Sequence, residues 1–331
     1  MSTTNTRTES GTAADSRLEF STGAGKSKSG FDVGSASEIP AGDDENCIAA
    51  SGPSAFESSL EREARLFTAK SKSSDGDGRR PLRILICDLE FIFDHERHAA
   101  YVDAEGDDAE RKLRWVFHRV AAAAWIVMRF DPRSDVPIIE EAQTIARDGA
   151  DERGIVSALF DAMMRHPDAI VTTWGGEYKD MPVLRRCAGE FGMSLPNQLR
   201  NLHPHANERI DLCAATSVLA TSMHLPEYAY ATGIPCKPWP AKHIGALVVR
   251  GDWKSVQEQA LADVLTTSVI SLRHLASHGS INCHPQRSLS VIAEAAGKAM
   301  PSSQFVRNTF APWSRQQVAA SRLKGTIIRA A

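Results

Sequence analysis

The stretch that most constrains the fold of this chain is an apolar segment that ends in two acidic residues. Residues 80–93 read R-P-L-R-I-L-I-C-D-L-E-F-I-F, and the run from Leu82 to Cys87 is largely apolar. Such a run after a turn-like lead-in predicts a buried β-strand. Asp88 and Glu90 follow two positions apart, and alternate residues of a strand share a face. Both carboxylates are therefore expected to point in the same direction.

Two carboxylates on one face at the end of a hydrophobic strand need a partner. Like charges in a half-buried place either raise the pKa of one group or are held by a cation. Asp and Glu together number 41 in 331 residues, so on the order of five acid-x-acid triplets arise by chance. The pair therefore indicates a divalent metal site only in combination with other acidic residues.

Composition and charge exclude several classes of protein. The formal charge of -3 at pH 7 argues against a histone-like basic protein. No apolar run reaches the roughly 18 residues that cross a bilayer, and the N-terminus lacks the apolar core of a signal peptide. The 6 cysteines include no C-x-x-C pair, which argues against a zinc knuckle. We expect a soluble, intracellular, cytoplasmic protein with no membrane partner.

Three regions of the chain differ in composition. Residues 1–78 are rich in Ser, Gly, Thr and Ala, which predicts a disordered tail whose protein partner, if any, stays unknown. Residues 79–280 carry the apolar periodic segments of a folded domain. Residues 281–331 form a C-terminal extension. Within it, residues 295–331 contain basic residues and no acidic residue, a composition suited to nucleic-acid phosphates.

Within the central region the apolar pattern predicts both strands and helices. Residues 116–128 and 136–145 are expected to continue the first strand as an antiparallel meander. Residues 151–166 are amphipathic and predict a helix. Residues 169–174 predict a strand that joins the sheet in parallel after this crossover helix. The predicted fold class is α/β, with a mixed sheet of antiparallel and parallel strands flanked by helices.

Two further acidic residues lie where a charge needs an explanation. Asp180 lies at a strand-loop-helix junction, where it could equally be a helix N-cap. Asp263 lies within the last long helix, residues 255–278, for which Ser255 and Glu258 suggest a capping box. If Asp263 faces inward it needs a partner, and if it faces outward it is an ordinary solvated side chain.

The four acids together favour a two-metal site. Carboxylates from separate elements of an α/β sheet can hold two divalent ions roughly 3.5 to 4 Å apart, an arrangement that cleaves phosphodiesters. Ligand sets made of oxygen alone select Mg²⁺ or Mn²⁺ rather than zinc. Asp88, Glu90, Asp180 and Asp263 are therefore the candidate catalytic residues and metal ligands.

The order of these motifs resembles a known family. The motifs are C-D-L-E, then W-G-G-E-Y-K-D-M-P-V-L at residues 174–184, then R-I-D-L, G-I-P-C-K and A-D-V. They are similar to those of DEDD 3'-5' exonucleases of the DnaQ-like, RNase H-like superfamily. The nearest branch is the predicted exonucleases related to the proofreading domain of family B DNA polymerases. The resemblance covers residues 81–278, and it implies an RNase H-like fold in which the four acids bind two Mg²⁺ or Mn²⁺ ions.

The chain departs from this family at several positions. Phe91 replaces the usual Thr, Gly175 the usual Asn, and Lys179 the usual aromatic residue. In the third motif the family has Tyr four residues before the aspartate, where this chain has Gln259. Another subclass has His at the position of Glu258. Glutamine can orient a water molecule but cannot accept its proton, so Gln259 is a water-positioning candidate and cleavage is expected to be slow.

Two functions stay open at this point. The first is a metal-dependent 3'-5' exonuclease that hydrolyses nucleic acid from single-stranded 3' ends, with DNA favoured over RNA. The second is a weak or inactive exonuclease-like domain that binds nucleic acid or a protein partner. The presence of all four acids favours the first, because an acid cluster without its metal is electrostatically costly and an inactivated relative would be expected to lose a ligand.

Overall fold

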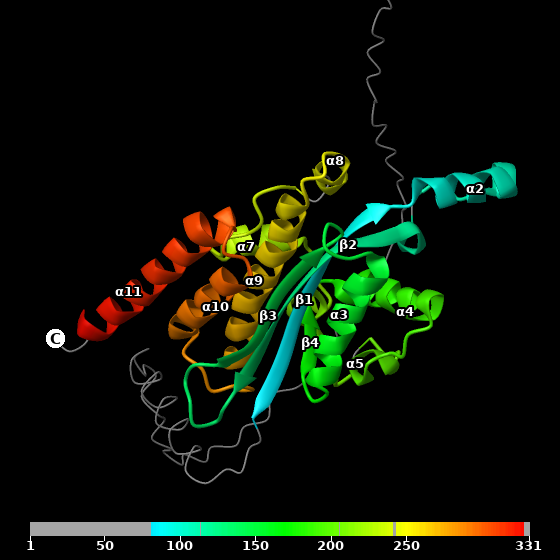
Figure 1. Cartoon of the computed structure of the whole chain (residues 1–331). Coiled ribbons are helices and arrows are strands. Elements are labelled where there is room, and N and C mark those ends of the chain that lie inside the picture. The colour runs from blue at the N-terminus through cyan, green and yellow to red at the C-terminus, as the bar shows by residue number, and fades with distance from the viewer. Residues whose placement is uncertain (1–80, 113, 205, 241–242, 328–331) are drawn as a thin grey trace, which may run out of the picture. The chain divides into compact units, whose positions relative to one another are not determined.

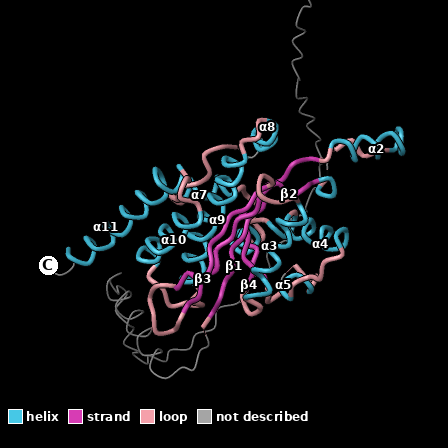
Figure 2. Tube along the Cα trace, viewed as in Figure 1, coloured by secondary structure: helices cyan, strands magenta, loops and turns pink. Residues whose placement is uncertain are grey.

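The computed structural model of the chain describes residues 81–112, 114–204, 206–240 and 243–327. These residues include a five-stranded sheet with helices on both of its faces (Figure 1 and Figure 2). The disorder predicted for residues 1–78 lies outside the described residues. No helix in the described part of the chain is long and apolar enough to cross a membrane.

Three strands form the predicted antiparallel meander. β1 (Leu82–Phe93) pairs with β2 (His118–Phe130), and β2 pairs with β3 (Ile138–Ala146). Helix α2 (His95–Glu105), which has no buried residue, projects from the connection between β1 and β2 (Figure 1). The pairing of β1 with β2 shifts register directly after Glu90.

Two parallel strands complete the sheet. The predicted helix α3 (Glu152–Arg165) begins after its N-cap Asp151 and leads to β4 (Ile170–Thr173), which pairs with β1 in parallel. β5 (Arg209–Asp211) pairs with β4 in parallel, and the strand order is β3-β2-β1-β4-β5. The predicted α/β fold class, with its antiparallel meander, parallel strands and flanking helices, is confirmed.

Strand β5 was not among the strands predicted from the sequence. Its three residues bracket one apolar side chain, Ile210, between Arg209 and Asp211, so no alternating pattern is visible. Both polar side chains are nevertheless buried, because tertiary hydrogen bonds satisfy them. The strand depends on contacts made far away in the sequence, which a local pattern cannot reveal.

Alternate residues of β1 pack on the two faces of the sheet. Ile84 and Ile86 belong to a hydrophobic cluster with helix α9 (Trp253–Ser277). The odd-numbered residues belong to a second cluster with α3 and α4 (Asp180–Phe191). Because helices cover both faces, the strand is apolar almost throughout its buried part. The two acids of the first motif continue the even-numbered side, which faces α9.

Helix α9 begins two residues earlier than predicted, and its cap is different. The N-cap is Asp252, whose carboxylate accepts a hydrogen bond from the Ser255 backbone N–H. The predicted capping box is wrong, because the carboxylate of Glu258 faces the C-terminal part of the chain. It accepts hydrogen bonds from Ser303 Oγ at 2.7 Å and from the Phe305 backbone N–H at 2.9 Å.

The remaining described helices surround this framework. They are α5 (Asn197–Arg200), α6 (Leu212–Ser217), α7 (Leu225–Ala231), α8 (Ile244–Val249), α10 (Pro285–Ala299) and α11 (Ala311–Ile327). Short 3₁₀ or π turns lie at Gly106–Asp108, Trp115–Phe117, Gly176–Tyr178 and Val306–Phe310. Leu289 and Ile292 of α10 pack in the same cluster as β1 and α9. The division of the chain at residue 280 stays a prediction.

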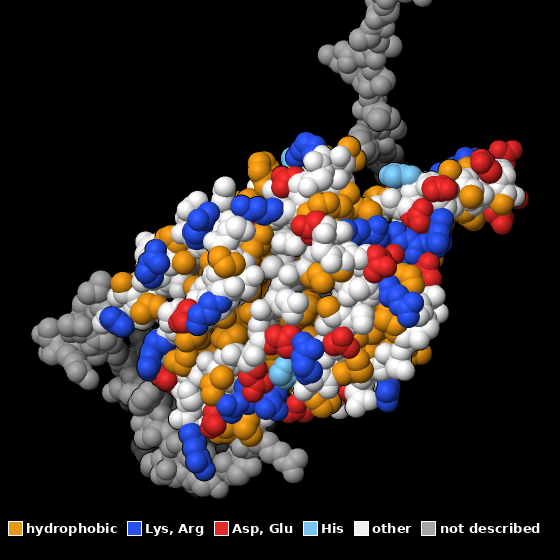
Figure 3. Space-filling model, in the orientation of Figure 1, with side chains coloured by type: hydrophobic (Ala, Val, Ile, Leu, Met, Phe, Trp, Pro, Cys, Tyr) orange, Lys and Arg blue, Asp and Glu red, His pale blue; other side chains and the backbone are white. Residues whose placement is uncertain are grey.

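Charged side chains are mixed on the face of the molecule seen in Figure 3, where Lys and Arg lie among Asp and Glu. Ion pairs account for part of this mixture. Arg83 and Arg129 both contact Glu140 at 2.8 Å, and Arg165 contacts Glu141 at 2.6 Å. The pair of Arg165 with Glu141 is exposed, and pairs of that kind contribute little to stability, whereas the two pairs with Glu140 are partly buried.

Candidate metal centre

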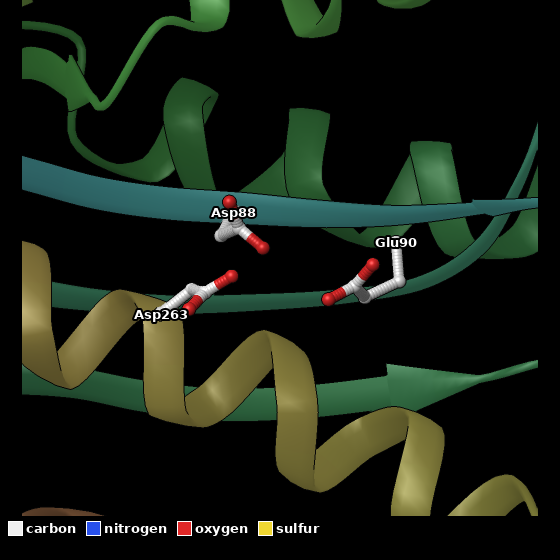
Figure 4. Close-up of side chains that lie close together, drawn as sticks. All are labelled: Asp88, Glu90 and Asp263. Carbon is white, nitrogen blue, oxygen red and sulfur yellow. The ribbon is translucent and has the colours of Figure 1, made fainter. Parts of the chain in front are cut away.

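Three acidic side chains meet between β1 and α9. Asp88 and Glu90 leave β1 toward the helix, as their spacing predicts, and Asp263 reaches them from α9 (Figure 4). One oxygen atom from each carboxylate lies within 4.8 Å of the other two. Three carboxylates at this separation can surround a divalent cation. Asp88 is the most accessible of the three, and the other two are buried.

Asp263 faces inward because α9 is enclosed over most of its length. Nearly every residue from Val256 to Leu272 is buried, although the helix carries several hydroxyl side chains. Thr266, Ser268 and Ser271 donate hydrogen bonds to carbonyls one turn earlier in the helix, which satisfies them without water. The Asp263 carboxylate can only accept hydrogen bonds, so backbone carbonyls of the helix cannot satisfy it and its buried charge is balanced by other elements.

Asp180 lines the same pocket as the three clustered acids. It is the first residue of α4 and is buried, but its carboxylate lies outside the closely spaced group. The interpretation of Asp180 as an N-cap is wrong, because the cap position belongs to Lys179 and carries no side-chain hydrogen bond. The four predicted acids therefore share one pocket, and three of them share one potential ion position.

The pocket has a volume of about 550 Å³. The segment between β4 and α4 forms one part of its lining, with Trp174, Tyr178 and Lys179. Residues 222–226 form another part, which includes His224. A cavity of this size is within the range that binds small molecules or part of a polymer.

Burial raises the pKa of each acid in the pocket. It raises the pKa of Glu90 to about 7 and the pKa of Asp180 to about 7. The pKa of Asp88 is raised well above its usual value by burial and then by repulsion from Asp263. Burial also raises the pKa of Asp263, although Lys237 acts in the opposite direction. The cluster is costly to ionise unless cations accompany it.

Two oxygen atoms of the cluster show that a cation would fit there. Glu90 Oε1 and Asp263 Oδ1 are buried and have no hydrogen-bond partner among the described residues. A buried acceptor without a donor is unfavourable by about 1 to 3 kcal/mol. A divalent ion would satisfy both atoms at once, and a donor set made only of carboxylate oxygens suits Mg²⁺ or Mn²⁺.

Lys237 lies in the pocket beside the acids, and the sequence analysis gave it no role. Its Nζ lies 2.5 Å from Asp263 Oδ2 and 3.8 Å from Glu90 Oε1, the latter too far for a hydrogen bond. Burial lowers the pKa of Lys237, but the neighbouring acids outweigh this effect and raise it. One ammonium cannot balance four carboxylates. The available sequence signal was a lysine among the prolines of residues 234–240, which fix its loop.

Gln259 holds the loop that carries Lys237. It is fully buried, its Nε2 donates to the Trp239 carbonyl at 2.6 Å, and its Oε1 accepts from the Trp239 N–H at 3.2 Å. Helical spacing does bring Gln259 close to Asp263, but the loop covers it. The predicted role in positioning water is therefore corrected, because both polar atoms are engaged away from solvent.

Replacing Gln259 is expected to loosen this loop. Gln259→Leu removes two hydrogen bonds from a buried site and should lower the free energy of unfolding by about 1 to 3 kcal/mol. Gln259→Tyr introduces a larger side chain at a fully buried position and should destabilise by a similar amount. Urea denaturation of both variants tests this. Gln257→Leu, a partly exposed neighbour, is the control, and a Tyr variant as stable as wild type would contradict the expectation.

Asp211 at the end of β5 fixes the loop before Asp180. Its carboxylate accepts hydrogen bonds from the Gly175 N–H at 2.8 Å and from the Glu177 N–H at 3.3 Å. Gly175 has a φ of 71°, a left-handed conformation that glycine adopts readily and asparagine tolerates. This accounts for Gly175 at a position where the family usually has Asn. The Glu177 carboxylate in turn pairs with buried Arg209 at 2.5 Å.

Gly176 in the same loop leaves no room for a side chain. An added Cβ would lie 2.5 Å from Thr173 Oγ1 and 2.7 Å from Thr173 Cβ. We expect Gly176→Ala to lower the free energy of unfolding by about 1 to 3 kcal/mol, measured by urea denaturation. Gly189→Ala is a matched control, because no atom lies within 4 Å of its added Cβ and alanine favours the helix. Equal effects of the two substitutions would contradict the steric argument.

Comparison with known proteins gives distant matches among solved structures and none elsewhere. No protein-family model matches the chain, and no curated protein matches it. Among solved structures, the chain is similar to the family B DNA polymerase from the hyperthermophilic archaeon Pyrobaculum calidifontis, with a TM-score of 0.43 and 15% sequence identity. The match covers 70% of this chain and 28% of the polymerase. A likeness this distant says nothing about activity.

Proposed function

We propose that this chain is a metal-dependent 3'-5' exonuclease that hydrolyses phosphodiester bonds from single-stranded 3' ends, with DNA favoured over RNA. The observation that carries the proposal is the meeting of Asp88, Glu90 and Asp263 within 4.8 Å, with two buried oxygen atoms that lack donors. Asp180 in the same pocket supports a second cation position. The order of these acids along the chain is the order that the exonuclease motifs require.

The chain's own residues supply most of what such a site needs. Asp88, Glu90 and Asp263 would hold Mg²⁺ or Mn²⁺, with Asp180 beside them. Divalent ions in a carboxylate site supply Lewis acidity for hydrolysis of a phosphodiester. The four acids concentrate negative charge on the pocket surface, and Lys237 balances part of it.

A proton acceptor is needed in place of the family's tyrosine. His224 is exposed and lines the pocket, and histidine is the commonest general base in enzymes. We expect His224→Gln to lower the cleavage rate about 100-fold at pH 7 and to weaken the rise of the rate with pH. A pH–rate profile on a labelled single strand tests this. Exposed His95, on helix α2 outside the pocket lining, provides the control variant His95→Gln, and equal profiles for wild type and His224→Gln would exclude the role.

The proposed function is tested with the purified full chain and a 5'-labelled single strand. Mn²⁺ or Mg²⁺ should produce a ladder that shortens from the 3' end, and excess chelator should stop it. Parallel DNA and RNA strands identify the preferred polymer, and a circular strand should resist. Asp88→Asn, purified in the same way, should produce no ladder, which excludes a contaminating nuclease. Binding of the strand without shortening under any of these conditions would favour the alternative, an inactive nucleic-acid-binding domain.

A further inference from the structure

Lys179 differs from Lys237, although both line the pocket. The ammonium of Lys237 is committed to Asp263 and is largely buried. Lys179 is exposed, and its ammonium makes no hydrogen bond or ion pair with any residue that the structure describes. The ammonium lies over the ring of Phe91, whose centroid is 4.4 Å from Nζ. The positive charge of Lys179 is therefore available to a ligand in the pocket.

The ring of Phe91 fixes where this charge lies. Phe91 follows Glu90 on β1, is 8% exposed, and packs edge-on against His118 with ring centroids 5.5 Å apart. A cation over an aromatic face is attracted by the negative charge density of the ring. The buried ring cannot move freely, so it restricts the lysine above it.

The backbone of Lys179 is fixed as well. Its N–H donates to the Gly176 carbonyl at 3.3 Å, within the loop that Asp211 holds through the Gly175 and Glu177 amides. The lysine is thus held at one end by the loop and at the other by the ring. Phe91 and Lys179 are also two of the positions at which this chain departs from the family it resembles, and the two departures contact each other.

The charges around Lys179 indicate what it can bind. Burial raises the pKa of Glu90 and of Asp180, and the positive charge of Lys179 acts in the opposite direction on both groups. The lysine is therefore within electrostatic reach of the acids without being paired to any of them. Once cations occupy the acids, a free ammonium at the pocket lining is suited to an anion on the ligand.

We propose that Lys179, held over the ring of Phe91, binds a backbone phosphate of the nucleic-acid strand close to the bond that is cleaved. The proposal rests on the function proposed above and assigns a substrate-binding role to a residue outside the acid cluster. A lysine binds phosphate as a point charge, without reading the base. The contact should therefore contribute affinity for any sequence and should weaken with salt.

Strand binding by the full chain tests this role. Binding of a 5'-fluorescent single strand is followed by anisotropy at several salt concentrations, with Ca²⁺ replacing Mg²⁺ and strand length checked afterward. Lys179→Met should weaken binding roughly 10-fold, since a charged hydrogen bond is lost. The slope of log affinity against log salt should fall in magnitude by about 0.7, the value for one phosphate contact. Lys254→Met, an exposed lysine near the start of α9 that does not line the pocket, should change neither quantity.

Two further measurements separate phosphate binding from simple balancing of the acids. A set of strands carries one uncharged methylphosphonate linkage each, placed at successive positions from the 3' end. At one of these positions the linkage should weaken binding by wild type. At the same position it should not weaken binding by Lys179→Met any further. Phe91→Leu should give an intermediate loss of affinity. The rise in Tm caused by Mn²⁺ should be unchanged in Lys179→Met.

The outcomes distinguish this proposal from the proposed function. Equal affinity and equal salt slope for wild type and Lys179→Met would overturn the phosphate contact while leaving the exonuclease proposal intact. A changed response to Mn²⁺ with an unchanged salt slope would also overturn it, because Lys179 would then only balance the acids. Failure of wild type to bind any strand would overturn both proposals.

Discussion

Replacing Asp263 with asparagine is expected to lower metal-dependent cleavage at least about 1,000-fold. The substitution keeps the shape of the side chain but removes one of three carboxylates that lie within 4.8 Å of one another. Divalent ions contribute several kcal/mol to stabilising the transition state, and each 1.36 kcal/mol corresponds to a tenfold change in rate. The initial rate of shortening of a labelled single strand in Mn²⁺ measures the loss.

The same variant separates a lost site from a lost fold. The Mn²⁺-induced rise in Tm seen with wild type should be absent in Asp263→Asn, because fewer carboxylates hold the ion. The circular dichroism spectrum should stay that of wild type. Asp161→Asn, on the exposed side of α3, is the matched control and should keep both activity and the metal response. Full activity of Asp263→Asn would show that the acid cluster is not where cleavage occurs.

Without metal, the protein is expected to lose stability as pH rises from about 4 to about 7. Glu90 and Asp180 both have a pKa of about 7 in the folded protein, above the usual values of 4.5 and 3.8. In this interval the folded protein keeps protons that the unfolded chain releases, so the free energy of unfolding falls with pH. The contribution of these two groups to the free energy of unfolding is fully present below their pKa values in the unfolded chain. It is lost as pH rises through about 7. The total change should be a few kcal/mol.

Metal should reverse this pH dependence. Ions bind the deprotonated carboxylates, so the stabilisation by Mn²⁺ should grow as pH rises through the same interval. Urea denaturation at several pH values, with chelator or with Mn²⁺, measures both effects. The ion-paired Glu140 and Glu141 have lowered pKa values, so they make the protein more stable as pH rises at lower pH. Comparing Glu90→Gln with wild type separates the effect of the acid cluster from theirs. Parallel profiles for wild type and Glu90→Gln in chelator would contradict the expectation.

The parts of the fold that a local pattern encodes could be predicted from the sequence. The apolar run of β1, the meander and the crossover helix α3 follow from periodicity, because their buried faces repeat within a few residues. The direction of Asp88 and Glu90 follows from the two-residue repeat of a strand. Asp263 was recognisable because an acid in an apolar helix needs a partner, and Lys237 proved to be one such partner.

The parts that depend on distant contacts could not be predicted. β5 exists because Arg209 and Asp211 find partners in other segments, and three residues show no period. The spacing of Gln259 from Asp263 is visible in the sequence and suggested a role in positioning water. Its hydrogen bonds with the Trp239 backbone, in a loop 20 positions away, are not visible there. Such contacts depend on which loop packs against which helix in the folded protein. The residue pattern of the loop alone, or of the helix alone, does not reveal them.

The hydrogen bonds of Glu258 bear on which fragment of the protein can be isolated. Glu258 precedes Gln259 on the helix that carries Asp263, and its buried carboxylate depends on donors from Ser303 and Phe305. A truncation at residue 280 would remove both of these donors and would expose the apolar surface that Leu289 covers. The smallest fragment that keeps the fold should therefore extend beyond residue 310, and shorter expression products should aggregate because their apolar surface is exposed.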